Sequence, residues 1–472
     1  MAEEHINFEF RDAVIYIPGL AVNQLSQDIE TIGNKIAGSL ERNSEEIGDA
    51  FVLKDGVEED YADGHRTRIR QIQVTTGEEV RTVADLYELN YRGCIRKSFE
   101  ERSLLGKCLT VLVMLFGSTP AFIRAAVQPG KTIAEKAQLF FAGAILGLMA
   151  LYFFLLLVTA IGTLTLGVGE TQLQTGIPGV AVSNPNQPVQ LETQAEGDPA
   201  NDAAEQSGSD AAQPSLQERD ELAAGWNRLV AWFPFLQGLI VIVAAVGALR
   251  KESLKEVISE AATEFVTAVG YIQAAERKQS VNGQLNALLE YILEKKPGYR
   301  KVHIVGYSFG SLIALDCLFP RYKPALHLNR VDSLVTIGCP FDMVRIFWPE
   351  YFTRRQAPAQ SNMQWFNIYS RYDVLGSNFR NDDQEQDAES LFEVKEGGGQ
   401  SAESSTAPVR LSPRNIAYDL GMEMGKYPLA TVLTFKGFRA HQLYWEGRGV
   451  SELSCFDLVM PSLLLHYTSD AG

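Results

Sequence analysis

The chain has 472 residues, of which 46% are hydrophobic, and its 42 Lys+Arg against 58 Asp+Glu leave a formal net charge of -16. This length allows one large domain with an insertion, or two or three domains, and the acidic balance argues against a nucleic-acid partner. The five cysteines are scattered, odd in number and without metal-type spacing, which is typical of reduced thiols in a cytosol-like compartment. The acidic, polar N-terminus lacks the pattern of a cleavable signal peptide.

Residues 1–100 are expected to form the first part of an α/β core. Ala13–Ile17 is a short buried-strand pattern that ends in the loop Pro18-Gly19-Leu20. Residues 21–48 look helical, and 66–74 and 83–91 alternate as strands do.

Residues 101–255 form a membrane insertion in this interpretation. Cys108–Ile123 is uncharged but short for a span and contains Pro120, so an interfacial or re-entrant segment over about 104–127 is favoured. Transmembrane helices are predicted over about 138–166 and 229–249, where uncharged apolar runs reach spanning length. Buried helices of a large soluble core are the alternative, and it is stronger for the second run, which contains Pro234.

The tract 170–221 between the predicted spans is polar and carries ten acidic residues and one basic residue, so a disordered loop is expected. Three basic residues lie between 124 and 136, before the first span, and three lie between 250 and 255, after the second. The positive-inside rule then predicts an integral membrane protein whose two outer flanks, and the catalytic domain they lead to, are on the cytoplasmic side.

Residues 256–472 are expected to supply the second part of the core. Helical patterns over 252–275 and 281–292 lead to a buried strand that begins at Val302, and further strands are predicted at Val331–Ile337 and Met363–Ser370. Strands that alternate with helices predict an α/β fold with a mostly parallel sheet and helices on both faces, interrupted by the transmembrane hairpin.

The stretch Val302–Pro320 carries the strongest chemical signal. A β-branched apolar run reaches Gly306-Tyr307-Ser308-Phe309-Gly310 and continues as a small-residue helical pattern. Glycines two residues on either side of a serine permit a turn so sharp that the serine hydroxyl stands clear of the sheet. The helix that follows offers free N–H groups to developing negative charge, so Ser308 is the candidate nucleophile.

A serine nucleophile needs a neutral imidazole to take its proton and a carboxylate to orient that imidazole. Three histidines follow Ser308, and they are His327, His441 and His466. His327 precedes every plausible acid, and His466 lies in an apolar run near the C-terminus. His441 is favoured as the base because it lies in a loop-like segment that leads into an aromatic pair, with His466 as the reserve. Asp373 is favoured as the acid because it follows a predicted strand directly, and Asp342 is its rival.

The elbow, the Asp373 segment and the His441 segment together resemble the α/β-hydrolase superfamily of lipases and esterases. The resemblance covers about residues 8–100 and 280–460, and Pro18-Gly19 stands where the family commonly has His-Gly. It implies an acyl-enzyme mechanism without a metal or organic cofactor. It also implies an oxyanion hole, for which Phe309 and Leu20 are the candidate N–H donors.

These patterns predict a membrane-anchored serine hydrolase that cleaves carboxylic esters, with lipid acyl esters as the substrates that a site beside a bilayer would meet. A thioesterase or an acyltransferase would use the same three residues. The alternative from another class is a catalytically silent, hydrolase-like membrane scaffold or signalling protein. No pattern in the sequence predicts an oligomeric state.

Overall fold

The computed structural model describes residues 11–20, 28–44, 49–127, 252–295, 298–321, 327–353, 355–358, 363–370, 373, 375–379, 393–395, 412–418, 441, 443–445 and 453–465, with single positions between 139 and 154. The predicted acidic tract 170–221, the predicted span 229–249 and His466 lie outside the described residues, as does most of the predicted span 138–166. All described residues belong to one unit, Met1–Leu157 with Ala244–Gly472.

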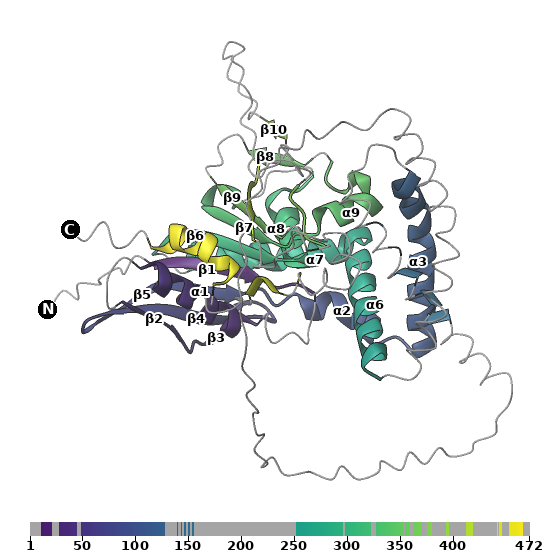
Figure 1. Cartoon of the computed structure of the whole chain (residues 1–472). Helices are drawn as coiled ribbons and strands as arrows, with labels where there is room; N and C mark the ends of the chain where they lie inside the picture. The colour runs from purple at the N-terminus through teal and green to yellow at the C-terminus, as the bar shows by residue number, and fades with distance from the viewer. Residues whose placement is uncertain are drawn as a thin grey trace, which may run out of the picture. The chain divides into compact units, whose positions relative to one another are not determined.

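A 9-stranded sheet organises the described residues, in the order β11-β9-β7-β6-β1-β5-β4-β2 with β3 paired to β4 (Figure 1). Pairing is parallel from β11 to β5 and antiparallel from β5 to β2 and β3. The bounds are β1 Arg11–Ile17, β2 Ala50–Lys54, β3 Glu58–Ala62, β4 His65–Thr76, β5 Glu79–Glu88, β6 Tyr299–Tyr307, β7 Ser333–Ile337, β9 Gln364–Tyr369 and β11 Arg414–Ala417. Two short strands, β8 Gln356–Pro358 and β10 Glu393–Lys395, pair separately.

The helices are α1 Ile29–Asn43, α2 Arg92–Glu100, α3 Leu104–Val127, α6 Glu252–Gln273, α7 Ala275–Glu290, α8 Phe309–Leu318, α9 Phe341–Phe347 and α12 Met460–Leu464. A π-helical turn, Tyr291–Lys295, extends α7. Short 3-10 turns occupy Leu328–Arg330, Pro349–Tyr351, Leu443–Trp445 and Cys455–Leu458.

The sheet is buried on both faces because alternate residues of its central strands serve two different cores. Ala13 and Ile15 of β1 pack with α7 and α8, whereas Val14 and Tyr16 pack with α1 and α12. Side chains of successive strand residues point to opposite faces, so one apolar strand can join both layers. The prediction of an α/β fold with a mostly parallel sheet and helices on both faces is confirmed at this level.

The segment predicted as interfacial or re-entrant is one continuous helix, α3, and Pro120 lies inside it. The interfacial or re-entrant placement of this segment stays a prediction. Among the described residues one stretch, Gly106–Arg124, is long and apolar enough to cross a membrane by length and composition, and 29% of it is buried. A core helix of a soluble protein meets the same criterion.

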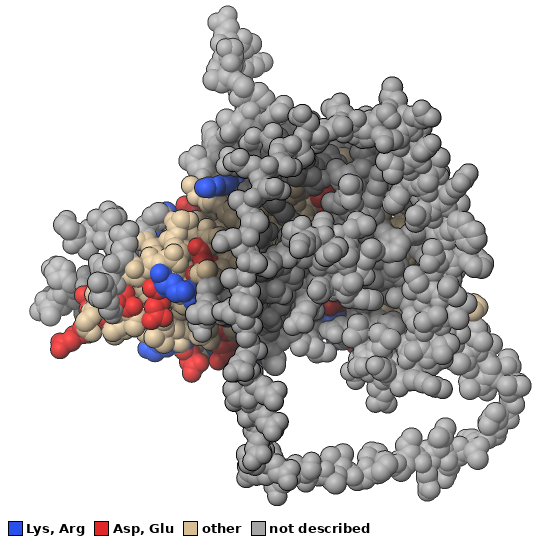
Figure 2. Space-filling view, in the orientation of Figure 1, with Lys and Arg blue, Asp and Glu red and all other residues tan. Residues whose placement is uncertain are grey.

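Charges of both signs mix over the antiparallel end of the sheet, in the region of β2–β5 and α1 (Figure 2). Arg66 pairs with Asp60 at 2.7 Å, and Arg68 with Glu58 at 3.3 Å, and all four side chains are more than half exposed. Exposed pairs of this kind contribute little to stability. This end of the sheet is therefore an ordinary solvated surface.

Candidate active site

Ser308 stands at the junction of β6 and α8, the two elements that the sequence predicts on either side of it. Its backbone has φ 51° and ψ -120°, a conformation that a non-glycine residue rarely adopts. A Cβ on Gly306 would lie 2.7 Å from Ser311 Cα, and one on Gly310 would lie 2.7 Å from the Pro18 carbonyl oxygen. Only glycine fits at these two positions, which explains the spacing around the serine.

The three predicted side chains meet at the carboxyl edge of the parallel strands. Ser308 Oγ lies 2.8 Å from His441 Nε2, and His441 Nδ1 lies 2.7 Å from Asp373 Oδ2. Both distances lie within the range for proton transfer between positioned groups. Asp373 and His441 are buried, whereas Ser308 is partly exposed, so the serine is the member of the set that a substrate can reach.

Three donors hold the Asp373 carboxylate. His441 Nδ1 and the Tyr444 hydroxyl both donate to Oδ2, the latter at 2.8 Å, and the Leu375 N–H donates to Oδ1 at 2.9 Å. Burial, and then the charge of Asp373, raise the pKa of Tyr444 well above its ordinary value, so its hydroxyl stays protonated and able to donate. Hydrogen bonds to both of its oxygens fix the orientation of the carboxylate beside the imidazole.

His441 is held through its backbone and through its ring. The Tyr307 hydroxyl donates to the His441 carbonyl at 2.6 Å, and the two rings stack with centroids 5.3 Å apart. Gly338, at φ 57°, packs closely against the His441 and Tyr444 rings. A larger residue would crowd both rings, because a Cβ at this position would lie 3.1 Å from His441 Cε1 and 2.9 Å from Tyr444 Cε2. Tyr307, at the end of β6, and Gly338, directly after β7, therefore hold the imidazole between them.

The rival residues lie elsewhere. Asp342 accepts a hydrogen bond from the Ser377 hydroxyl and lies 3.5 Å from Arg345, while the His441 ring bonds Asp373 instead. His327 lies in the turn before Leu328–Arg330, which leads to the start of β7. Because β6 and β7 are parallel, that turn is at the sheet edge opposite to Ser308.

The two predicted oxyanion donors lie on neighbouring backbone segments. Phe309 is the first residue of α8, where N–H groups have no partner within the helix. Ser308 itself cannot serve in this way, because its N–H donates to the Ile337 carbonyl at 2.8 Å. Leu20 is 7% exposed and ends the described part of the loop after β1, and this loop contacts the first turn of α8 at Gly310.

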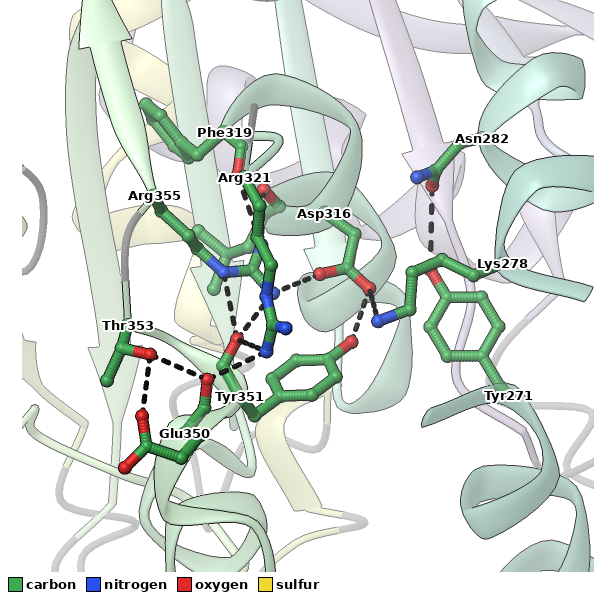
Figure 3. A network of polar contacts seen from close by, with 11 residues as sticks. Tyr271, Lys278, Asn282, Asp316, Phe319, Arg321, Glu350, Tyr351, Thr353 and Arg355 are labelled. Carbon is green, nitrogen blue, oxygen red and sulfur yellow. Dashed lines mark hydrogen bonds and ion pairs between the residues drawn. The ribbon is translucent and has the colours of Figure 1, made fainter. Parts of the chain in front are cut away.

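A buried ionic network anchors the far end of α8 (Figure 3). The Arg355 guanidinium pairs with Asp316 and donates to the carbonyls of Leu315 and Phe319, each at 3.2 Å. Lys278 lies 3.5 Å from the same carboxylate and 4.1 Å from the centre of the Tyr351 ring. A cation at the C-terminus of a helix donates hydrogen bonds to the last carbonyls and interacts favourably with the negative end of the helix dipole. This network therefore stabilises α8, the helix that begins directly after Ser308.

Two tyrosines complete the site without having been predicted, Tyr307 and Tyr444. Tyr307 is the middle residue of the glycine–serine motif and Tyr444 belongs to the aromatic pair after His441, but neither pattern indicates which atom a hydroxyl will bind. All five cysteines are free thiols, and the described residues contain no group of three or more His, Cys, Asp or Glu that could hold a metal ion. Comparison with protein-family models, curated proteins and solved structures finds no match to the chain.

Proposed function

We propose that the protein is a serine hydrolase of the α/β-hydrolase type that cleaves carboxylic esters through an acyl-enzyme. The observation that carries the proposal is the pair of distances at His441, 2.8 Å to Ser308 Oγ and 2.7 Å to Asp373 Oδ2. The strained serine at a strand-to-helix turn supports it, because backbone strain is retained where the surrounding structure and the chemistry require it.

The reaction runs in two balanced halves. The Ser308 oxygen attacks the ester carbonyl carbon while its proton passes to His441 Nε2, and the carbonyl electron pair moves to the oxygen as an oxyanion. Collapse of this intermediate breaks the bond to the alcohol, which leaves with the proton from His441. Water then attacks the acyl-enzyme by the same steps, giving the acid and free Ser308. Asp373 stabilises the imidazolium in both halves.

We also propose that the enzyme is anchored in a membrane and acts on lipid acyl esters from its cytoplasmic side. The uncharged runs 137–169 and 229–249 and the basic residues outside them support the anchor. Helix α3 adds an exposed apolar stripe, in which Val113, Phe116 and Val127 are each more than 60% exposed. A thioesterase or an acyltransferase differs only in the leaving group or the acyl acceptor.

The test is ester hydrolysis by membranes that contain the full chain. Wild type is expected to release p-nitrophenol from p-nitrophenyl butyrate, and Ser308→Ala is expected to be inactive. Ser462→Ala is the control, since that hydroxyl donates to the carbonyl of Val459, the residue directly before its own short helix α12. Equal, low rates for wild type and Ser308→Ala would instead favour the silent scaffold.

A further inference from the structure

Two arginines of one helix hold the peptide groups on both sides of Leu20. Arg92 Nε donates to the Gly19 carbonyl at 2.9 Å, and Arg96 Nη1 donates to the Leu20 carbonyl at 3.1 Å. Both arginines belong to α2, one helical turn apart. The carbonyls before and after the Leu20 Cα are therefore both directed toward this helix.

The loop lies between α2 and the first turn of α8. The hydroxyl of Tyr91, a fully buried residue, donates to the Pro18 carbonyl at 2.7 Å from the α2 side. The same carbonyl oxygen is 2.7 Å from where a Cβ of Gly310 would stand, at the start of α8. No side chain can enter there, so the loop backbone packs directly on the elbow.

The direction of the Leu20 N–H follows from the bond that Arg92 makes. In a planar trans peptide the C=O of one residue and the N–H of the next point in opposite directions. The Gly19 carbonyl points toward α2, so the Leu20 N–H points away from it. A positive charge bonded to the carbonyl also polarises the peptide, which makes its N–H a stronger donor.

We infer that Arg92 and Arg96 are positioning residues for the oxyanion hole. Arg92 aims the Leu20 N–H toward the substrate oxygen and polarises its peptide, and Arg96 fixes the peptide that follows Leu20. Neither guanidinium touches the substrate in this role. The inference rests on the proposed function, because an oxyanion forms only if Ser308 attacks a carbonyl. It gives a functional role to α2, a helix that supplies none of the three residues Ser308, His441 and Asp373.

The test compares Arg92→Met and Arg96→Met with Lys97→Met in full-length protein. Lys97 lies on the same helix, carries the same charge and is 76% exposed, and it forms an ion pair with Glu101 at 3.9 Å. Each arginine variant is expected to lower kcat for p-nitrophenyl butyrate about tenfold or more with KM within about twofold, as for an interaction made only in the transition state. Lys97→Met should retain wild-type values.

Partial rescue separates positioning from a general loss of structure. Arg92→Lys keeps a cationic donor and is expected to recover most of kcat, while Arg92→Gln, which is neutral, should not. If Arg92→Met fails to fold, the comparison of kcat between Arg92→Lys and Arg92→Gln still tests the inference. Arginine variants that fold and match wild type in kcat, beside an inactive Ser308→Ala, would overturn the inference alone. An inactive wild type would instead contradict the proposed function.

Discussion

The Tyr444 hydroxyl donates to Asp373 at 2.8 Å and at the same time accepts the Ser370 N–H at 2.9 Å. This one oxygen ties the candidate acid to the end of β9, the strand that precedes it. The carboxylate that orients His441 is thereby fixed to the sheet as well as to the imidazole. We therefore expect that removing the Tyr444 hydroxyl will change the activity, although Tyr444 does not contact the substrate.

Tyr444→Phe is expected to lower kcat about tenfold, since a hydrogen bond to a charged group is worth about 1.5–3 kcal/mol. Steady-state kinetics of the variant, alone and combined with Asp373→Asn, measures this. If the hydroxyl acts through the carboxylate, adding Tyr444→Phe to Asp373→Asn should change little. A full additional loss in the double variant would mean that Tyr444 acts on some other group.

Gly338→Ala is expected to reduce activity because the new methyl group would press on the His441 and Tyr444 rings. Gly77→Ala is the matched control, since Gly77 also has a positive φ, at 64°, but no atom within 4 Å of a Cβ. Both variants should lose about 1–3 kcal/mol of stability from backbone strain. Only Gly338→Ala should lose activity in the remaining folded protein, and an equal effect of the two on kcat would contradict this.

The Asp316–Arg355 pair predicts an acid-sensitive contribution to stability. Burial alone would raise the pKa of Asp316, but Arg355 and Lys278 outweigh it and bring the pKa below its ordinary value. The carboxylate therefore stabilises the fold above about pH 4, and this contribution is lost as pH falls through the lower, folded-state pKa. Thermal unfolding of the full chain in detergent, measured over this range, follows the loss.

Asp316→Asn should be less stable than wild type by about 3–5 kcal/mol at about pH 7, because it leaves a buried guanidinium without its counter-charge. The difference should shrink as the pH falls. Asp60→Asn is the control, because Asp60 pairs with Arg66 at the surface and its side chain is 66% exposed. This variant should change stability by under about 1 kcal/mol. Parallel stability curves for wild type and Asp316→Asn across the acid range would contradict the assignment.

The membrane proposal predicts which sites an impermeant thiol reagent reaches. In a cysteine-free variant, Asn201→Cys in sealed, cytoplasmic-side-out vesicles should react only after the vesicles are opened. Glu78→Cys, in the exposed turn between β4 and β5, should react in the sealed vesicles. Labelling of Asn201→Cys before opening would overturn the proposed topology.

Local patterns predicted the elements that carry the site. The spacing of Gly306, Ser308 and Gly310 is a local steric requirement, so one short stretch was enough to predict β6, the turn and α8. Asp373 and His441 followed from their order along the chain, and the structure brings both to Ser308. The sequence analysis did not predict β2 and β3, the two strands that pair with β4. Strands with exposed, charged residues such as Glu58 lack a clear apolar alternation.

Contacts between distant segments could not be predicted in the same way. Arg355 lies 39 residues from Asp316, and no spacing rule pairs a buried arginine with a helical aspartate over that distance. Tyr444 and Asp373 are 71 residues apart and meet only because β9 and the Leu443–Trp445 turn reach the same sheet edge. The residues that support the site are set by packing between elements, whereas the elbow is set within one.

The most direct test of the central claim is the position of the adduct formed with a fluorophosphonate, which reacts with an activated serine. Membranes with the full chain are treated with the reagent, and the modified peptide is identified by mass spectrometry. We predict one adduct on Ser308, greatly slowed in His441→Ala and absent from Ser308→Ala. An unmodified Ser308 in folded wild-type protein, or the same labelling rate in His441→Ala, would contradict a serine nucleophile activated by His441.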